Sequence, residues 1–308
     1  MIDFVKQTFA EFSKNRCTTL AAALAYYTIF SLPPLIFLLV GVLSFSLSAI
    51  YGSDAAEEKA EVVVQQQVEQ MVGNAEAGET INEILDNRQQ ESGTWWKSLL
   101  SIVGILVGAT GVVAALQDSL NRVWEVKPDP EDSGIKDYLM KRVLSLGMIV
   151  GLGFILLVSL VLSAVLTSAG ERIAAGIGID ASLASAINYV VQFLVSVVVF
   201  AAIFKFMPDA IVRWRDVIAG AFITAVLFLV GRLVLQLYLG NSEPGAQLGS
   251  AAASLAVLLV WVYYTSMIVL YGAEVTQVYA TRYGEGIRPE AHAVRFSEVV
   301  RQKGGAVS

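Results

Sequence analysis

One arginine lies inside a long apolar run of this 308-residue chain. Arg232 falls between Asp216 and Leu239, about seven residues or roughly 10 Å from the end of that run. Within a membrane-spanning helix an arginine costs about 2.5–3.5 kcal/mol on insertion scales, so it needs a partner, water or a ligand. Guanidinium geometry suits phosphate, which predicts that Arg232 holds an anionic group such as a lipid phosphate. Two alternatives stay open: Arg232 snorkels to the surface, or it pairs with Glu243.

Uncharged polar residues recur at four-residue spacing in the same apolar runs. Residues at i and i+4 share one face of a helix, so each set forms a stripe. Together the stripes predict an outward-facing polar cleft in which Arg232 is the charged residue. The predicted headgroup-binding residues are Arg232, Gln236, Asn188, Gln192, Ser163 and Thr167.

A second group of polar residues falls at the opposite ends of the apolar runs. Its members are Glu274, Lys205, Asp118, Arg122 and Asn121. We expect Glu274 to pair with Lys205 or Arg122 in a structural network near the membrane surface. A proton or ion relay is the alternative role for this group.

The residue inventory predicts no enzyme, no metal and no cofactor. A single cysteine, Cys17, cannot form an intrachain disulfide or a cysteine metal cluster. The single histidine, His292, falls in the polar tail, and no Gly-x4-Gly-Lys-Ser/Thr motif for ATP phosphates occurs. A net charge of −6 argues against nucleic acid as a partner.

Composition points to a bilayer as the solvent of these residues. Hydrophobic residues make up 56% of the chain and charged residues 16%, whereas a soluble domain carries about 25% charged residues. A spanning helix needs about 20 mostly apolar residues. We therefore predict an all-α polytopic helical bundle with six spans, at 33–50, 98–117, 143–168, 184–207, 216–239 and 250–274.

Other segments complete the predicted membrane domain, 1–283. Residues 3–30 are expected to form an in-plane or re-entrant helix with an elbow at Pro33 and Pro34, because proline interrupts helical hydrogen bonding. The connection 51–97 is expected to hold two short amphipathic helices over the outer ends of the bundle, and the tail 284–308 to be mobile. Trp124 and Trp214 are expected as interfacial anchors.

Basic residues predict the orientation and the location. Sixteen lysines and arginines fall on the side of both termini and four on the other side. The positive-inside rule therefore places the N- and C-termini in the cytoplasm. No cleavable signal peptide is expected, since the first apolar run continues to Ile50.

Four stretches resemble the YihY/virulence factor BrkB family across about residues 5–283. They are Leu20–Pro34 (LAAALAYYTIFSLPP), Leu120–Glu125 (LNRVWE), Lys205–Pro208 with Trp214–Asp216 (KFMP, WRD) and Leu270–Thr276 (LYGAEVT). The resemblance implies a six-span protein of the bacterial inner membrane. It marks Ala23, Tyr26, Ser31, Pro34, Asn121, Trp124, Pro208, Gly272 and Glu274. The family once carried the label ribonuclease BN. A metal-dependent nuclease needs a cluster of histidine and carboxylate ligands and a basic groove for RNA, whereas this chain has one histidine, in the tail, and no basic groove is apparent in its sequence.

These observations together predict non-enzymatic transport or flipping of an amphipathic anion, such as phospholipid or a lipid-linked envelope precursor. Membrane lipids are the expected partners, with envelope proteins on the 51–97 loop as a further expectation and a homo-oligomer left open. Two other functions stay open. One is a structural or assembly factor of an envelope complex, and the other is an ion-coupled transporter or channel that uses Glu274 or Asp118.

Overall fold

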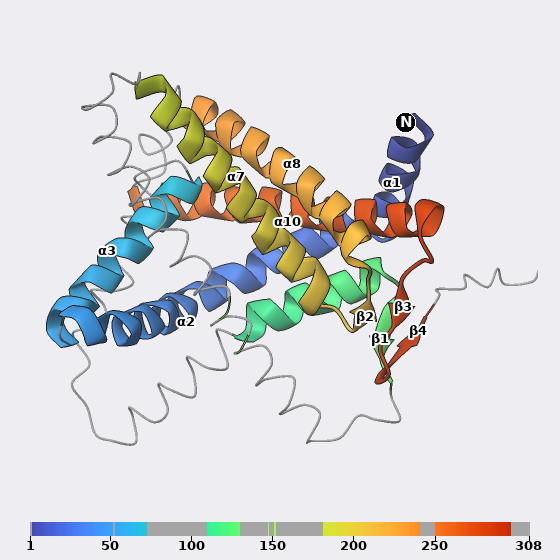
Figure 1. Ribbon diagram of the computed structural model, residues 1–308, viewed down its shortest axis with the longest axis horizontal. Coiled ribbons are helices and arrows are strands. Elements are labelled where there is room, and N and C mark those ends of the chain that lie inside the picture. Colours follow the sequence, from blue (N-terminus) through green and yellow to red (C-terminus); the bar gives the residue numbers. More distant parts are fainter. Residues whose placement is uncertain are drawn as a thin grey trace, which may run out of the picture.

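The chain folds into a predominantly helical bundle, shown as a computed structural model in Figure 1. The structure describes residues 2–51, 53–72, 110–129, 147, 151, 181–240 and 250–296. Within these ranges three helices are long and apolar enough to cross a membrane, Cys17–Phe45, Trp214–Val234 and Ala256–Tyr283, and Gln192–Phe206 is a shorter apolar helix. The polytopic helical character is thereby confirmed, and the number six stays a prediction.

The N-terminal region breaks at a different place from the one predicted. Helix α1 (Ile2–Lys14) ends at a turn in which Arg16 has a φ of 52°, and α2 (Cys17–Tyr51) then begins. Pro33 and Pro34 lie inside α2, which is continuous through them. The predicted interruption of the helix at the prolines is therefore wrong, since neighbouring groups in a membrane helix compensate for the donor that proline lacks, whereas a change of direction there stays a prediction. The in-plane or re-entrant orientation of residues 3–30 stays a prediction.

A helical hairpin forms at the far end of α2. Helix α3 (Ser53–Val72) folds back along α2, and its Ala60 and Val64 pack against Ile36, Val40 and Leu43. A helix is thus present in the first part of the 51–97 connection, and it packs along α2; its place over the outer ends of the bundle stays a prediction. The second one, around Ile81–Leu85, lies outside the described residues.

The remaining helices of the bundle lie where the hydropathy pattern predicted spans, and α7, α8 and α10 begin close to the predicted first residues. Residues 110–123 form the end of the second predicted span, and α7 (Ala181–Phe206) and α8 (Trp214–Gly240) match the fourth and fifth. Helix α10 (Ser250–Tyr283) continues well past the predicted end at Glu274. Of the third span, 143–168, only Gly147 and Gly151 are described, and both are helical.

Helices α8 and α10 cross with their backbones in close approach. A Cβ on Gly220 would collide with Thr276 Oγ1 and lie 2.7 Å from the carbonyl oxygen of Gly272. A Cβ on Gly272 would in turn collide with Thr224 Oγ1. Each threonine donates to the glycine carbonyl one turn earlier in its own helix, Thr224 to Gly220 at 2.7 Å and Thr276 to Gly272 at 3.0 Å. The crossing is therefore a reciprocal pair of small-residue contacts, of the kind that lets membrane helices pack tightly.

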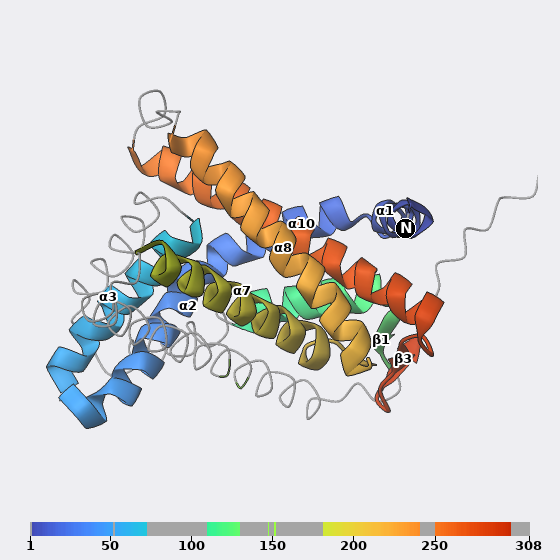
Figure 2. The same cartoon turned by 45° about the horizontal axis from the view of Figure 1, so that its top comes forward.

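Four short strands gather at one end of the bundle. Strand β1 (Val126–Pro128) pairs antiparallel with β4 (Ala293–Arg295), and β2 (Ala210–Ile211) pairs antiparallel with β3 (Arg288–Pro289). Figure 2 shows that α1 and the last turn of α10 lie at the same end, which we call the strand end. Residues 288–295 are thus paired with connections between the predicted spans. The expectation of a mobile tail is wrong for this part, and residues 297–308 lie outside the described range.

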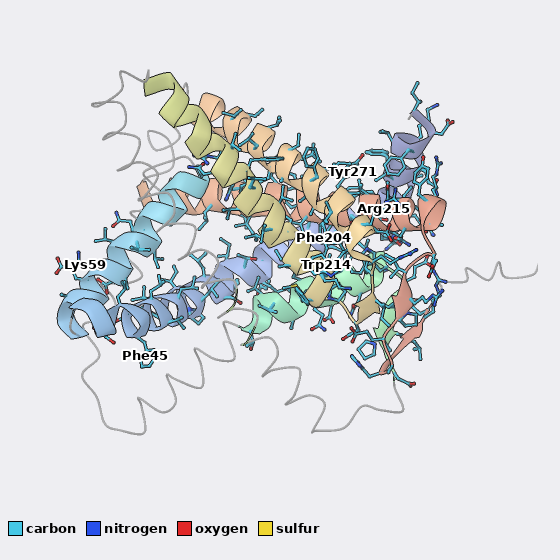
Figure 3. All side chains as sticks on the ribbon, viewed as in Figure 1. Phe45, Lys59, Phe204, Trp214, Arg215 and Tyr271 are labelled. Carbon is cyan, nitrogen blue, oxygen red and sulfur yellow. The ribbon has the colours of Figure 1, made fainter. Side chains whose placement is uncertain are left out.

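The largest buried side chains lie close to the strand end. Trp124 is buried, its ring contacts Phe204 edge-on at 6.3 Å, and its Nε1 donates to the carbonyl oxygen of Ala273 at 3.0 Å. The prediction of Trp124 as an interfacial anchor is therefore wrong, because the indole fills the junction of three helices. Trp214 is exposed at the start of α8 (Figure 3), and its ring contacts Phe206 edge-on at 5.8 Å.

Candidate functional site

An arginine and a glutamine meet between α7 and α8. Arg232 Nη1 donates to Gln192 Oε1 at 3.2 Å, and the arginine is half-buried. The next residues along α8, Leu233 and Val234, are exposed apolar side chains in a membrane-length helix. Arg232 therefore turns toward a neighbouring helix. Because glutamine is neutral, this contact holds the guanidinium in place without cancelling its charge.

Other residues predicted for this site fall outside the description. The helical backbone is described at Asn188 and Gln236, but the placement of their side chains is not. Ser163, Thr167 and Glu243 lie outside the described residues altogether. Of the predicted headgroup-binding set, the structure brings together Arg232 and Gln192.

At the strand end, a buried aspartate organises the connections. Asp209 Oδ2 accepts from Asn121 Nδ2 at 2.8 Å, and Oδ1 accepts from Gln117 Nε2 at 3.1 Å. Asn121 Oδ1 accepts from the backbone N–H of Asp209 at 2.8 Å. His292 Nε2 lies 3.2 Å from Asp209 Oδ1, and the backbone N–H of Glu290 donates to Asp209 O at 3.1 Å. One carboxylate thus joins the second-span helix, the α7–α8 connection and the segment after α10.

A second buried carboxylate, Glu274, has partners that the sequence did not indicate. It is 0% exposed, and its Oε1 accepts from Asn15 Nδ2 at 2.7 Å and from Cys17 Sγ at 3.5 Å. With its amide in the orientation that satisfies both ends, Gln277 donates to Glu274 Oε2 at 3.2 Å. The described hydrogen-bond partners of Glu274 are therefore neutral groups: Asn15 in the turn between α1 and α2, Cys17 at the start of α2, and Gln277 on α10 itself.

Lys205 does not pair with Glu274 as predicted. Its Nζ donates to the carbonyl oxygen of Val212 at 2.5 Å and lies 5.8 Å from the ring centre of Trp214. The lysine thus closes the connection between α7 and α8. Pairing by sequence depth was wrong here because a nearby backbone carbonyl and an aromatic face satisfied the ammonium group.

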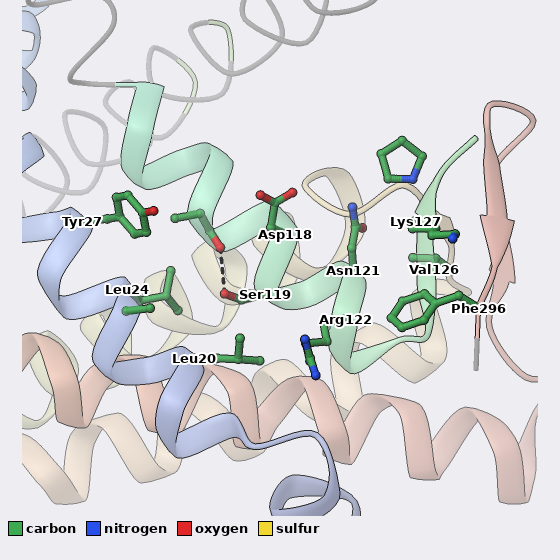
Figure 4. A pocket seen from close by; sticks show the side chains of 13 residues that line it. Leu20, Leu24, Tyr27, Asp118, Ser119, Asn121, Arg122, Val126, Lys127 and Phe296 are labelled. Carbon is green, nitrogen blue, oxygen red and sulfur yellow. Dashed lines mark hydrogen bonds between the residues drawn. The ribbon is translucent and has the colours of Figure 1, made fainter. Parts of the chain in front are cut away.

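The remaining predicted residues of this end line a cavity of about 360 Å³. Asp118, Asn121 and Arg122 from the helix of residues 110–123 form one wall, as Figure 4 shows. Leu20, Leu24 and Tyr27 of α2 form the facing wall. The strand side is closed by Val126, Lys127, Pro128 and Phe296. Among the described contacts, the residues predicted as one network are divided between Glu274 with its neutral partners, Lys205 with Val212, and the cavity wall, where Asn121 also bonds Asp209.

The turn between α1 and α2 is the feature that sequence reasoning missed. Asn15 is buried, whereas its neighbour Lys14 is 60% exposed and pairs with Glu11 at 2.9 Å and Glu125 at 3.3 Å. The hydrogen bond with Glu11 raises the pKa of Lys14 above its ordinary value. The run Lys14-Asn15-Arg16, polar and directly before an apolar helix, was the available signal of a turn. It did not indicate a partner on α10.

The chain has apolar helices of membrane length, a charged side chain between two of them, and short paired strands at one end of the bundle. These features define a polytopic helical membrane protein. The chain belongs to the virulence factor BrkB family, whose sequence model matches residues 8–297. Similar proteins include UPF0761 membrane proteins of Aeromonas salmonicida (27% identical, covering 89% of this chain and 87% of the relative) and Psychromonas ingrahamii (26%, 83% and 80%). A third, from Pseudoalteromonas atlantica, is 26% identical over 89% of this chain and 85% of the relative. No solved structure matches the chain.

Proposed function

We propose that this membrane protein moves an amphipathic anion, such as a phospholipid or a lipid-linked envelope precursor, across the bacterial inner membrane. The observation that carries the proposal is the Arg232–Gln192 contact between α7 and α8. An arginine inside a spanning helix is costly, and its described partner leaves the charge in place. A phosphate headgroup supplies the opposite charge and the paired oxygens that guanidinium binds best.

The depth of Arg232 fits a substrate that passes through the membrane. Arg232 lies 16 residues after Asp216 and eight before Gly240, which corresponds to about 24 Å and about 12 Å along the helix. Because a hydrocarbon core is about 30 Å thick, a headgroup bound here has left the interface. We orient the strand end toward the cytoplasm, since the predicted cytoplasmic segments carry the excess of lysine and arginine.

Reconstitution in liposomes with fluorescent phospholipid tests the proposal. We expect the wild-type chain to scramble the lipid and Arg232→Gln to slow scrambling at least tenfold, because a hydrogen bond to a charged group is worth about 1.5–3 kcal/mol. Arg232→Lys keeps the charge but not the paired geometry, and should fall between the two. Arg213→Gln is the matched control, since Arg213 is an exposed residue at the strand end that pairs with Glu285 at 3.2 Å.

Each other outcome points to a different function. Ion flux without lipid movement would favour the ion-coupled transporter. Absence of both from a folded, correctly inserted protein would favour a structural or assembly factor. Unchanged scrambling in Arg232→Gln would remove Arg232 from the mechanism.

A further inference from the structure

We propose that the strand-end cavity binds the phosphate headgroup of an anionic phospholipid from the leaflet on that side. This cavity is distinct from the Arg232–Gln192 contact, because its walls come from α2, residues 110–123 and β1 rather than from α7 and α8. The inference rests on the proposed function only for the class of ligand. It gives that ligand a first binding position before any crossing of the membrane.

The cavity lies at the depth where headgroups meet acyl chains. Helix α2 is of spanning character over Cys17–Phe45, 29 residues or about 43 Å, which matches a bilayer including its headgroup regions. The wall residues Leu20 to Tyr27 follow Cys17 by three to ten residues, or about 4–15 Å. The cavity therefore starts at the headgroup level and reaches the beginning of the hydrocarbon core.

The charges around the cavity favour an anion. Two basic side chains, Arg122 and Lys127, line it, against one carboxylate, Asp118. Lys127 is exposed on β1 and makes no ion pair with another residue that the structure describes. The buried Asn121 lies in the same wall. Its Nδ2 donates to the Asp209 carboxylate and its Oδ1 accepts from the backbone N–H of Asp209, and these two hydrogen bonds hold the wall in place. Arginine and lysine near a membrane surface attract anionic lipid headgroups.

The opposite wall suits acyl chains rather than water. Leu20, Leu24 and Tyr27 present mostly apolar surface to the cavity. Tyr27 is also exposed on the outside of α2, where it adjoins the exposed Tyr26 and Phe30, whose rings lie 4.7 Å apart. Apolar surface thus runs from the cavity onto the outer face of a spanning helix. A ligand with a charged head and an apolar tail fits both parts, whereas a soluble phosphate ester would use the charged part alone.

Native mass spectrometry of the full-length chain in detergent tests this site, with dioleoyl phosphatidylglycerol, dioleoyl phosphatidylcholine and inorganic phosphate as probes. We expect retention of phosphatidylglycerol over phosphatidylcholine. Lys127→Gln should weaken phosphatidylglycerol binding about fivefold, the change that about 1 kcal/mol per interfacial basic residue gives. Leu20→Trp fills the cavity from its apolar wall. This substitution should weaken phosphatidylglycerol binding at least as much as Lys127→Gln does, and it changes no charge.

Two matched controls accompany these variants. Arg213→Gln removes a basic residue of the same end that pairs with Glu285 away from the cavity. Leu194→Trp adds the same ring on an exposed position of α7. Both should retain phosphatidylglycerol like the wild type.

Three results would overturn the inference. The first is equal retention of both lipids, and the second is equal loss in a control and its matched cavity variant. The third is tight binding of inorganic phosphate that displaces the lipid, which would assign the cavity to a soluble anion. Selective retention that Lys127→Gln and Leu20→Trp reduce would support the site even if the protein scrambled no lipid, so the two proposals fail separately.

Discussion

Asn15→Ala should destabilise the protein by removing the shortest hydrogen bond to a fully buried carboxylate. Asn15 Nδ2 lies 2.7 Å from Glu274 Oε1, and Glu274 is 0% exposed. Hydrogen bonds to charged groups contribute about 1.5–3 kcal/mol, and without Asn15 the buried Oε1 would keep only the longer contact with Cys17 Sγ at 3.5 Å. We therefore expect the free energy of unfolding to fall by about 2 kcal/mol, or about 30-fold in the unfolding equilibrium constant.

A double-mutant cycle with Glu274→Gln isolates this contact. At a pH at which Glu274 is ionised, the amide keeps the shape and an acceptor oxygen but removes the charge, so Asn15→Ala should cost only about 1 kcal/mol in that background. Unfolding in bicelles, followed by steric trapping, gives the four free energies. Cys17 Sγ and Gln277 also approach Glu274, and both stay in place throughout the cycle.

Lys14→Ala is the control from the same turn. Lys14 is 60% exposed, and solvent screens its ion pairs with Glu11 and Glu125, so its loss should cost less than about 1 kcal/mol. If Asn15→Ala cost no more than Lys14→Ala, or cost the same with Glu274 and with its glutamine replacement, the contact would contribute nothing specific and the reasoning would be wrong.

Two further substitutions test the packing of the bundle in the same unfolding assay. Gly220→Ala should cost about 1–3 kcal/mol, because the added methyl group meets Thr276 and the carbonyl of Gly272; an unchanged stability would mean that α8 and α10 do not approach as described. Trp124→Phe should cost about 1–2 kcal/mol, since it removes the donor to Ala273 O and part of a buried ring, and a neutral result would place the indole at the membrane surface instead.

Hydropathy located the helices because lipid contact requires apolar side chains around most of each helix. The starts of α7, α8 and α10 lie within three residues of those predicted. Helix α10 continues to Tyr283, nine residues past the predicted end of the last span. Glu274 looked like a charge at the membrane surface, but Asn15 and Cys17 hydrogen-bond to it inside the protein, and the end of the membrane span itself stays a prediction.

Contacts between distant segments were beyond the sequence patterns. Arg232 and Gln192 were predicted as members of one headgroup-binding set, because a charge in an apolar run demands polar neighbours at similar depth, but their direct contact was not predicted. No comparable rule indicated that His292 would reach Asp209, since His292 follows the last span in a polar segment without periodicity. The strands have two or three residues each, too short for an alternating pattern to show.

The pairing at the strand end also orders events during synthesis. Strands β1 and β2 precede their partners β4 and β3 by at least the length of α8 and α10, so the ribosome has synthesised both helices before either pair can form. The end of the 110–123 helix, which carries Asn121, and the α7–α8 connection, which carries Asp209, therefore reach their final arrangement only after the last part of the chain has been made. Assembly of this face is a late step, completed when the segment after α10 folds back onto connections made much earlier.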